Sequence, residues 1–416
     1  MTEPTKTIPT NLRIDGSRLL WRLETLAKIG DTGDGGCRRL ALSDEDRQGR
    51  DLLVSWMREL GLEVRIDRIG NIVGIMAGEA DGPAVMLGSH IDTVATGGRY
   101  DGALGVLAAL EAVAALKEAG IRPKRPLAVI AFTNEEGVRF HPDILGSCVW
   151  TGELSLEEAY AIRDDEGFSV GDELARIAYA GETEPGSIEA HAYLELHIEQ
   201  GPILDAEGGG IGAVTGVQAI TWLELTIEGE PNHAGTTPMR YRRDAGYAAA
   251  RIVAFARDLT HGIEDQVANA GQIRFEPGNV NVVPKRAVFT IDIRNPDDAR
   301  LAAAERRLRE FAATIAEEER VTVSTRDLAR FPAVRFDERL VASVEAAAAA
   351  LGRPVRRMFS GAGHDAQIMA SIAPSAMIFV PSVRGLSHNP QEYTAPDDLI
   401  AGANVLLAAA IAAAQE

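Results

Sequence analysis

The fold is decided by two stretches, AVMLGSHIDTV at residues 84–94 and LAVIAFTNEEG at residues 127–137. Each starts as a continuous apolar run, which is typical of a strand buried on both faces of its sheet, and ends in a polar cluster. A helix is predicted between them, at residues 105–117. Strands separated by helices indicate an α/β domain, and the polar clusters fall where such sheets place their ligand sites.

The same pattern extends outward on both sides. Residues 43–61 are predicted to form a helix, because Ser43 can cap it and acidic residues occupy its first turn. Strands are expected at residues 63–66 and 71–76, and apolar strands with glycine-rich loops return at residues 358–381.

A different pattern lies between these parts. Residues 221–228, TWLELTIE, alternate between apolar and polar side chains, as in a strand with one exposed face. A helix, two strands, a helix and a strand are expected to follow, at residues 242–259, 272–275, 286–294, 297–319 and 320–324. This order is the split βαβ pattern of a small α+β domain. We therefore predict an α/β main domain with a central mixed sheet at residues 1–212 and 326–416, and an inserted α+β domain at residues 213–325.

Composition excludes several classes of protein. With 416 residues, 46% of them hydrophobic, the chain is long enough for two cores. A formal net charge of −19 argues against a broad nucleic-acid surface. The N-terminus lacks the apolar stretch of a signal peptide, and the apolar runs at 344–351 and 405–414 are too short to cross a membrane. Two cysteines form no disulfide framework, so a cytoplasmic location without membrane partners is expected.

Five of the eight histidines lie in short segments rich in glycine and acidic residues: His90, His197, His233, His364 and His388. His90, His197 and His388 are the candidate ligands among them. Asp101 and Glu136 supply carboxylates in similar segments. Imidazole and carboxylate together suit zinc, manganese, cobalt or nickel. Two neighbouring metal ions need one bridging carboxylate and about two further ligands each, and these five residues are enough.

Two other carboxylates have predicted roles beside the ligands. Asp92 lies two residues from His90 at a strand end, hence on the same face, where it is placed to orient that imidazole. Glu135 and Glu136 are adjacent, and adjacent side chains of an extended chain point apart. One of them can therefore bind metal while the other takes a proton from the attacking water.

Eight motifs, in order along the chain, carry a resemblance to a known family: GSHIDTV, YDGALGV, FTNEEGVRF, LELHIEQGP, HAGTTPM, NVNVVP, SGAGHDAQ and GLSHNP. Together they resemble the hydantoinase/carbamoylase-type amidases, a group related to dinuclear zinc aminoacylases and carboxypeptidases. The resemblance runs from about residue 20 to the C-terminus. It implies a metallopeptidase-like main domain, an inserted lid and dimerisation domain, and a homodimer.

The resemblance also implies roles for the metal site. His90, Asp101 and His197 match the ligands of one metal, and Asp101 bridges to a second one. Glu136 and His388 match the other ligands of that second metal. The implied cofactor is therefore two divalent ions per subunit, Zn²⁺ first, with Mn²⁺, Co²⁺ and Ni²⁺ also suited to these ligands.

Further roles concern the reaction. Glu135 matches the general base and acid, and His233 matches a lid histidine that stabilises the developing oxyanion. Gln200 matches a residue that contacts the ureido or amide group. The remaining matches are Asn281 and Arg294 at the substrate carboxylate, Ser360 and Gly361 at the other end of the substrate, and His364 and Asp365 as supporting hydrogen-bond partners.

These roles imply a metal-dependent amidohydrolase that acts on a small molecule. The first hypothesis is cleavage of N-carbamoyl-L-amino acids to amino acid, CO₂ and ammonia. The alternatives are an allantoate amidohydrolase and a β-ureidopropionase, which share the metals and the base. A non-catalytic metal-binding protein is a different class, and Glu135 argues against it, because a pure binder needs no unligated carboxylate beside the metals.

Overall fold

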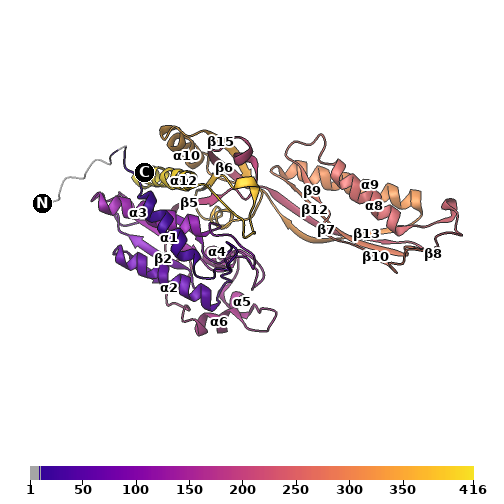
Figure 1. Ribbon diagram of the computed structural model, residues 1–416, viewed down its shortest axis with the longest axis horizontal. Coiled ribbons are helices and arrows are strands. Elements are labelled where there is room, and N and C mark those ends of the chain that lie inside the picture. Colours follow the sequence, from indigo (N-terminus) through magenta and orange to yellow (C-terminus); the bar gives the residue numbers. More distant parts are fainter. Residues whose placement is uncertain (1–8, 10) are drawn as a thin grey trace. The chain divides into compact units, whose positions relative to one another are not determined.

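The computed structural model describes residue 9 and residues 11–416. The chain divides into two compact units: unit 1 ends at Gly216 and resumes at Arg335–Glu416, and unit 2 is Val217–Val334 (Figure 1). The boundaries predicted after residues 212 and 325 fall inside strands. The first lies in β6 (Ile211–Val217), and the second lies in β13 (Thr322–Phe331).

Strand β13 is longer than the predicted strand at residues 320–324. It pairs with β7 (Ala219–Glu228) as far as Phe331, through a register irregularity between Asp327 and Ala329. This irregularity, with charged side chains around it, interrupts the alternation of polar and apolar residues. The sequence pattern of a strand therefore ends before the pairing of β13 with β7 does.

Unit 1 is built around a mixed sheet. In the described part of the chain this sheet has nine strands, in the order β1-β2-β4-β3-β5-β16-β6-β14, with β15 beside β6. Apart from β6, they are β1 (Glu63–Ile66), β2 (Ile72–Met76), β3 (Ala84–His90), β4 (Leu127–Phe132), β5 (Ala190–Ile198), β14 (Val334–Arg335), β15 (Val355–Ser360) and β16 (Ser375–Val380).

The four central strands, β4, β3, β5 and β16, run parallel to one another. The outer pairs, β1 with β2, β2 with β4 and β16 with β6, are antiparallel. Every residue of β3, β4 and β16 is buried, as the continuous apolar runs predicted. The predicted fold class, an α/β domain with a central mixed sheet, is confirmed.

Unit 1 also contains helices, several of which pack against this sheet. They are α1 (Gly16–Ala27), α2 (Asp44–Glu59), α3 (Ala103–Glu118), α4 (Leu145–Thr151), α5 (Leu156–Ala161), α6 (Val170–Arg176), α7 (Ile203–Ala206), α10 (Glu338–Ala350), α11 (Asp365–Met369) and α12 (Pro396–Gln415), with the short 3₁₀ turn η2 (Val383–Gly385). Ser43 caps α2 by accepting a hydrogen bond from the Asp46 amide, as predicted. Helix α3 is buried up to Leu116 and is apolar there except for Glu111, which pairs with Arg18 and Arg22, so the helix lies inside the unit.

Helix α12 begins at Pro396, well before the apolar run from residue 405. Of the helices that the structure describes, it alone has the length and composition that could span a membrane. It packs against α3, α10, β5 and β16, and most of its residues are buried inside the unit. That is the environment of a core helix.

Unit 2 is the predicted split βαβ domain. Its antiparallel sheet has the order β10-β12-β7-β13, with β9 beside β12, among the residues described. Along β7 and β12 buried residues alternate with more exposed ones, and the buried ones form a core with α8 and α9. The further elements are η1 (Met239–Tyr241), α8 (Ala245–Asp258), β9 (Val267–Asn269), β10 (Ile273–Glu276), β12 (Arg286–Asn295) and α9 (Asp298–Glu319). Outside this sheet, β8 (Asn232–His233) pairs with β11 (Val282–Val283).

Candidate dimetal active site

The candidate ligands gather at one edge of the central sheet. His90 is the last residue of β3, and His197 is the last but one of β5. These two strands are parallel, so their carboxyl ends meet at the same edge, where open α/β sheets bind ligands. Asp101 lies in the loop that leads into α3, two residues before that helix begins.

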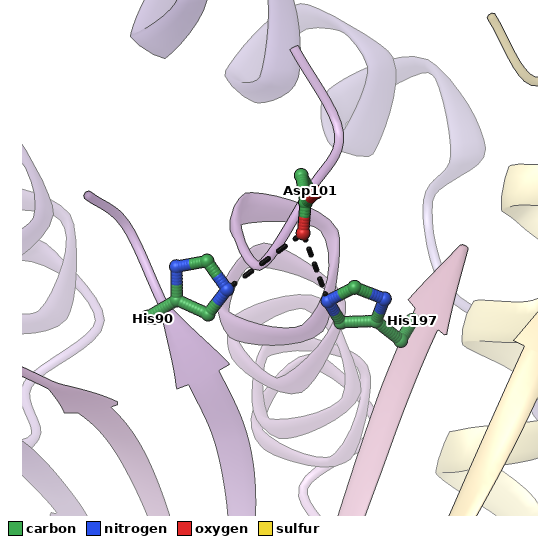
Figure 2. A group of neighbouring side chains, drawn as sticks. All are labelled: His90, Asp101 and His197. Carbon is green, nitrogen blue, oxygen red and sulfur yellow. Dashed lines mark ion pairs between the residues drawn. The ribbon is translucent and has the colours of Figure 1, made fainter. Parts of the chain in front are cut away.

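The first group consists of His90, Asp101 and His197 (Figure 2). Asp101 Oδ1 lies 3.8 Å from His90 Nε2 and 3.1 Å from His197 Nε2. Each Nδ1 donates to a backbone carbonyl, that of Asp92 at 3.0 Å and that of Ile198 at 2.9 Å. Because a carbonyl can only accept, both Nδ1 atoms carry a proton, and both Nε2 atoms face the carboxylate.

Gly102 permits this close arrangement. It has a φ of +61°, and a Cβ there would lie 2.4 Å from ring atoms of His90. A larger residue would displace the imidazole, so glycine is required beside the ligand group.

The second group shares Asp101 with the first. It consists of Asp101, Glu136 and His388. His388 Nε2 lies 3.4 Å from Asp101 Oδ2 and 3.4 Å from Glu136 Oε2. Asp101 therefore presents one oxygen to each group, which is the geometry of a carboxylate that bridges two cations.

These residues fit a pair of divalent cations. Burial and the charge of Asp101 raise the pKa of Glu136 well above its usual value. Burial lowers the pKa of His90 to about 4, so its imidazole is neutral, as a ligand must be. The buried Glu136 Oε1 also has no hydrogen-bond partner among the residues described. Against the effect of burial, the hydrogen bond and charge of Asp101 raise the pKa of His197 to about 9, so a bound cation would take the place of a proton there. Crowded buried carboxylates beside imidazoles are the donor set that a cation stabilises.

Glu135 lies beside the ligand groups but belongs to neither. Its Oε2 is 3.4 Å from His90 Nε2, whereas Glu136 faces His388. The two side chains diverge because the chain leaves β4 in a turn, with Asn134 at a φ of +55°. Burial, then the charges of Asp365 and Glu136, raise the pKa of Glu135 well above its usual value. Glu135 is thus a buried carboxylate with a high proton affinity next to the cation site.

Asp92 orients His90 through its backbone carbonyl and not, as predicted, through its carboxylate. Its backbone carbonyl, at 3.0 Å, holds His90, whereas its carboxylate is 3.8 Å from that imidazole. The carboxylate instead accepts hydrogen bonds from the amides of Glu135 and Glu136, both at 3.3 Å. Asp92 therefore joins the end of β3 to the turn that carries the two glutamates.

A cavity of about 150 Å³ opens at these groups. Its walls include Ala362, Gly363 and His364, besides Glu135 and every candidate ligand except His90. Gln200 also lines it, and its Nε2 donates to Asp101 Oδ2 at 2.9 Å. Pockets for drug-sized ligands hold about 300–1,000 Å³, so this cavity suits a small substrate.

The glycine-rich loop after β15 contributes through residues other than Ser360. The Ser360 side chain is buried, and its Oγ pairs with His364 Nε2 at 2.8 Å. Gly361 is exposed, and neither residue is among those that line the cavity. The Ser360 side chain therefore does not face the cavity, and it holds His364 against the His197 ring. Asp365 accepts from Ser147 Oγ at 2.6 Å behind the site.

The other three predicted residues lie in unit 2. His233 Nδ1 accepts hydrogen bonds from the amides of Gly235 and Thr236, at 3.0 and 3.2 Å, so its proton is on Nε2. Asn281 is next to it, since its carbonyl accepts from the Ala234 amide at 2.9 Å. Arg294 is near the end of β12, where Asp292 binds its guanidinium at 2.8 Å.

The sequence interpretation missed several residues of the site. Ser387 Oγ donates to Asp101 Oδ2 at 3.2 Å, and Glu392 accepts from the Asp101 amide. Asp143 lines the cavity, and burial raises its pKa. Ser387 and Glu392 lie close to His388 in the sequence GLSHNPQEY, and this closeness to a candidate ligand could have identified them. For Asp143 the only signal was its closeness to Glu135 and Glu136 in sequence.

Fold and site together define the class, a hydrolytic enzyme with a dimetal site. Residues 86–412 match the family model described as peptidase family M20/M25/M40. The chain belongs to this family, and within it to the hydantoinase/carbamoylase amidases, as the resemblance predicted.

Three relatives illustrate the similarity. An N-carbamoyl-L-amino-acid amidohydrolase of Rhizobium meliloti is 44% identical over 409 residues, which cover 97% of this chain and 98% of the relative. A ureidoglycolate hydrolase of Arabidopsis thaliana is 37% identical, covering 96% and 87%. A solved hydantoinase/carbamoylase family amidase of Burkholderia multivorans has a TM-score of 0.95 and 44% identity, covering 97% and 99%.

Proposed function

We propose that this enzyme hydrolyses the carbamoyl C–N bond of N-carbamoyl-L-amino acids, releasing the amino acid, CO₂ and ammonia. The observation that carries the proposal is the pair of ligand groups that share Asp101, with Glu135 beside them but in neither group. The substrate class is supported by the Rhizobium meliloti relative, which is an N-carbamoyl-L-amino-acid amidohydrolase in name and aligns along nearly its whole length.

Two divalent cations held by the two ligand groups would polarise the ureido carbonyl and make water more acidic. Glu135 takes the proton of the water that attacks the ureido carbon, because its buried carboxylate has a high proton affinity. It then returns that proton to the nitrogen whose bond to carbon breaks. Gln200 lies at the same carboxylate, Asp101, and offers its amide to the ureido group.

We propose Zn²⁺ as the resident ion, since imidazole nitrogen and carboxylate oxygen donors are typical of zinc enzymes. Mn²⁺, Co²⁺ and Ni²⁺ accept the same histidine and carboxylate donors, and supply in the cell decides among them.

His233, Asn281 and Arg294 are proposed to contact the substrate from unit 2. His233 has Nε2 as its donor, as stabilisation of an oxyanion requires. Arg294 has a planar guanidinium suited to a carboxylate, and Asp292 holds it in one orientation.

We further propose that the enzyme works as a homodimer, because His233 and Asn281 lie beyond one end of the larger sheet of unit 2, whereas Arg294 lies near its other end. Arg286 pairs with Glu228 and Arg294 pairs with Ile220, so Arg294 lies eight residues along β12, or about 26 Å at about 3.3 Å per residue. His233 and Asn281 lie beyond the Glu228 end of β7. The resemblance assigns both Asn281 and Arg294 to the substrate carboxylate. This distance favours an arrangement in which two chains contribute these residues to one substrate.

Subunit mixing tests this arrangement. His233→Ala and Arg294→Ala are each expected to lose most activity, and their mixed dimers are expected to regain part of it. In such a dimer one site carries both substitutions and the other carries neither. Differently tagged chains, exchanged and purified on both tags, supply the mixed dimer for a rate measurement.

The matched control is a mixture of His233→Ala with Asn281→Ala. These residues lie together, so every site of that mixed dimer keeps one substitution and activity stays low. Recovery in the control, or none in the first mixture although dual-tagged dimers form, would contradict shared sites.

The substrate is tested by ammonia or amine release from metal-reconstituted protein. N-carbamoyl-L-amino acids, N-carbamoyl-β-alanine, allantoate and ureidoglycolate are compared at equal concentration. The highest kcat/KM is expected for an N-carbamoyl-L-amino acid. Preference for one of the other three compounds would overturn the substrate proposal and leave the mechanism intact. Absence of turnover of all four compounds, with both metals bound, would contradict the proposed function as a whole.

A further inference from the structure

Glu392 is a buried glutamate that the proposed reaction does not use. In the sequence it lies between His388 and the start of α12, and its side chain is 5% exposed. Its Oε1 accepts hydrogen bonds from two consecutive backbone amides, that of Tyr100 at 3.0 Å and that of Asp101 at 3.3 Å. The side chain thus reaches the peptide that carries the shared ligand, from a segment 291 residues further along the chain.

The surroundings of Glu392 are closely fitted to this contact. A Cβ at Gly98 would lie 2.2 Å from the carboxyl carbon of Glu392, so this position has room only for glycine. The segment that carries Glu392 also supplies Ser387, whose Oγ donates to Asp101 Oδ2 at 3.2 Å. His388, in the same segment, is 3.4 Å from the same oxygen. The backbone and the side chain of Asp101 are therefore held by one stretch of chain.

We propose that Glu392 is a positioning residue of the dimetal site, which fixes the peptide of Asp101 so that its two carboxylate oxygens face the two ligand groups. The inference rests on the dimetal site of the proposed function, but not on its substrate. Two consecutive amides that donate to one acceptor oxygen fix the position and the orientation of the peptide between them. A bridging ligand needs such support, because sites of this sort tolerate about 0.5 Å of error.

The test is a Zn²⁺ titration of metal-free protein, followed with a competing chromophoric chelator. Glu392→Ala removes the acceptor and is expected to weaken the binding of Zn²⁺ by about 10–100-fold, the range for partners that orient metal ligands. Glu392→Gln keeps an acceptor oxygen and is expected to restore affinity close to that of the unaltered protein. Gly98→Ala displaces the Glu392 side chain by another route and is expected to weaken binding as well.

Asp337→Ala is the matched control. Asp337 Oδ1 also accepts two consecutive amides, those of Arg339 and Leu340 at 2.9 and 3.2 Å, at the start of α10. This variant is expected to lower the unfolding temperature of the metal-free protein while leaving Zn²⁺ affinity unchanged.

Three results would overturn the inference. Glu392→Ala or Gly98→Ala could bind Zn²⁺ as tightly as the unaltered protein. Glu392→Gln could lose as much affinity as Glu392→Ala, in which case the charge matters and not the acceptor. The unaltered protein could bind fewer than two equivalents, which would remove the dimetal site itself. A wrong substrate leaves this titration unaffected, since no turnover is measured.

Discussion

Replacing Glu135 by glutamine is expected to abolish turnover while both metal ions stay bound. Glutamine keeps the size of the side chain but cannot take or return a proton at that position. General acid–base catalysis contributes about 10²–10⁴-fold to rates, and Glu135 is proposed to act in two steps, so kcat should fall by at least about 10³-fold. The metal content should hold, because neither ligand group includes Glu135.

The neighbouring variant makes this result specific. Glu136→Gln changes a residue of the second ligand group, 3.4 Å from His388, and should lose metal together with activity. Metal per subunit is measured by atomic emission on both variants, next to the rate of ammonia release. Retained turnover in Glu135→Gln would remove Glu135 from the mechanism, and loss of metal there would make it a ligand.

Asp101→Asn is expected to cost both a metal ion and the activity. Asp101 is the residue common to the two ligand groups, with one oxygen near His197 and the other near His388. An asparagine offers one acceptor oxygen, so it can serve only one group. Its amide nitrogen also cannot accept from Gln200 or Ser387, which now donate to Oδ2.

The expected magnitude is large, because metal-assisted polarisation contributes several kcal/mol. A loss of that size corresponds to about 10²–10³-fold or more in kcat/KM. The measurements are metal stoichiometry after dialysis and kcat/KM at saturating metal. Two tightly bound ions and an unchanged rate in Asp101→Asn would show that the carboxylate does not bridge them.

Much of the fold was predictable because each element repeats its pattern locally. The apolar runs of β3 and β4 end in polar clusters, and β7 alternates without interruption, so type and position were both readable. The ends of unit 2 could not be predicted in the same way, because β6 and β13 extend across the predicted boundaries and β13 is irregular at Asp327. Strand pairing, rather than composition, decides where those strands stop.

The candidate site was predictable in its residue types and less so in its contacts. His90, Asp101, Glu136, His197 and His388 come together as two groups because their strands and loops share one edge of the sheet. The inward turn of Ser360 depends on packing against His364, which no local pattern encodes. The contact between Glu392 and the Asp101 amide joins segments far apart in the chain, so only the folded structure reveals it.

The central claim is that hydrolysis depends on two cations held by the groups that share Asp101. The most direct measurement is to strip the enzyme with a chelator and add back Zn²⁺ or Mn²⁺ stepwise, following hydrolysis of the best N-carbamoyl-L-amino acid. Activity is predicted to be absent in the metal-free protein, to rise as metal is added, and to reach its plateau at two equivalents per subunit. Full activity without metal, or a plateau at one equivalent, would contradict the account.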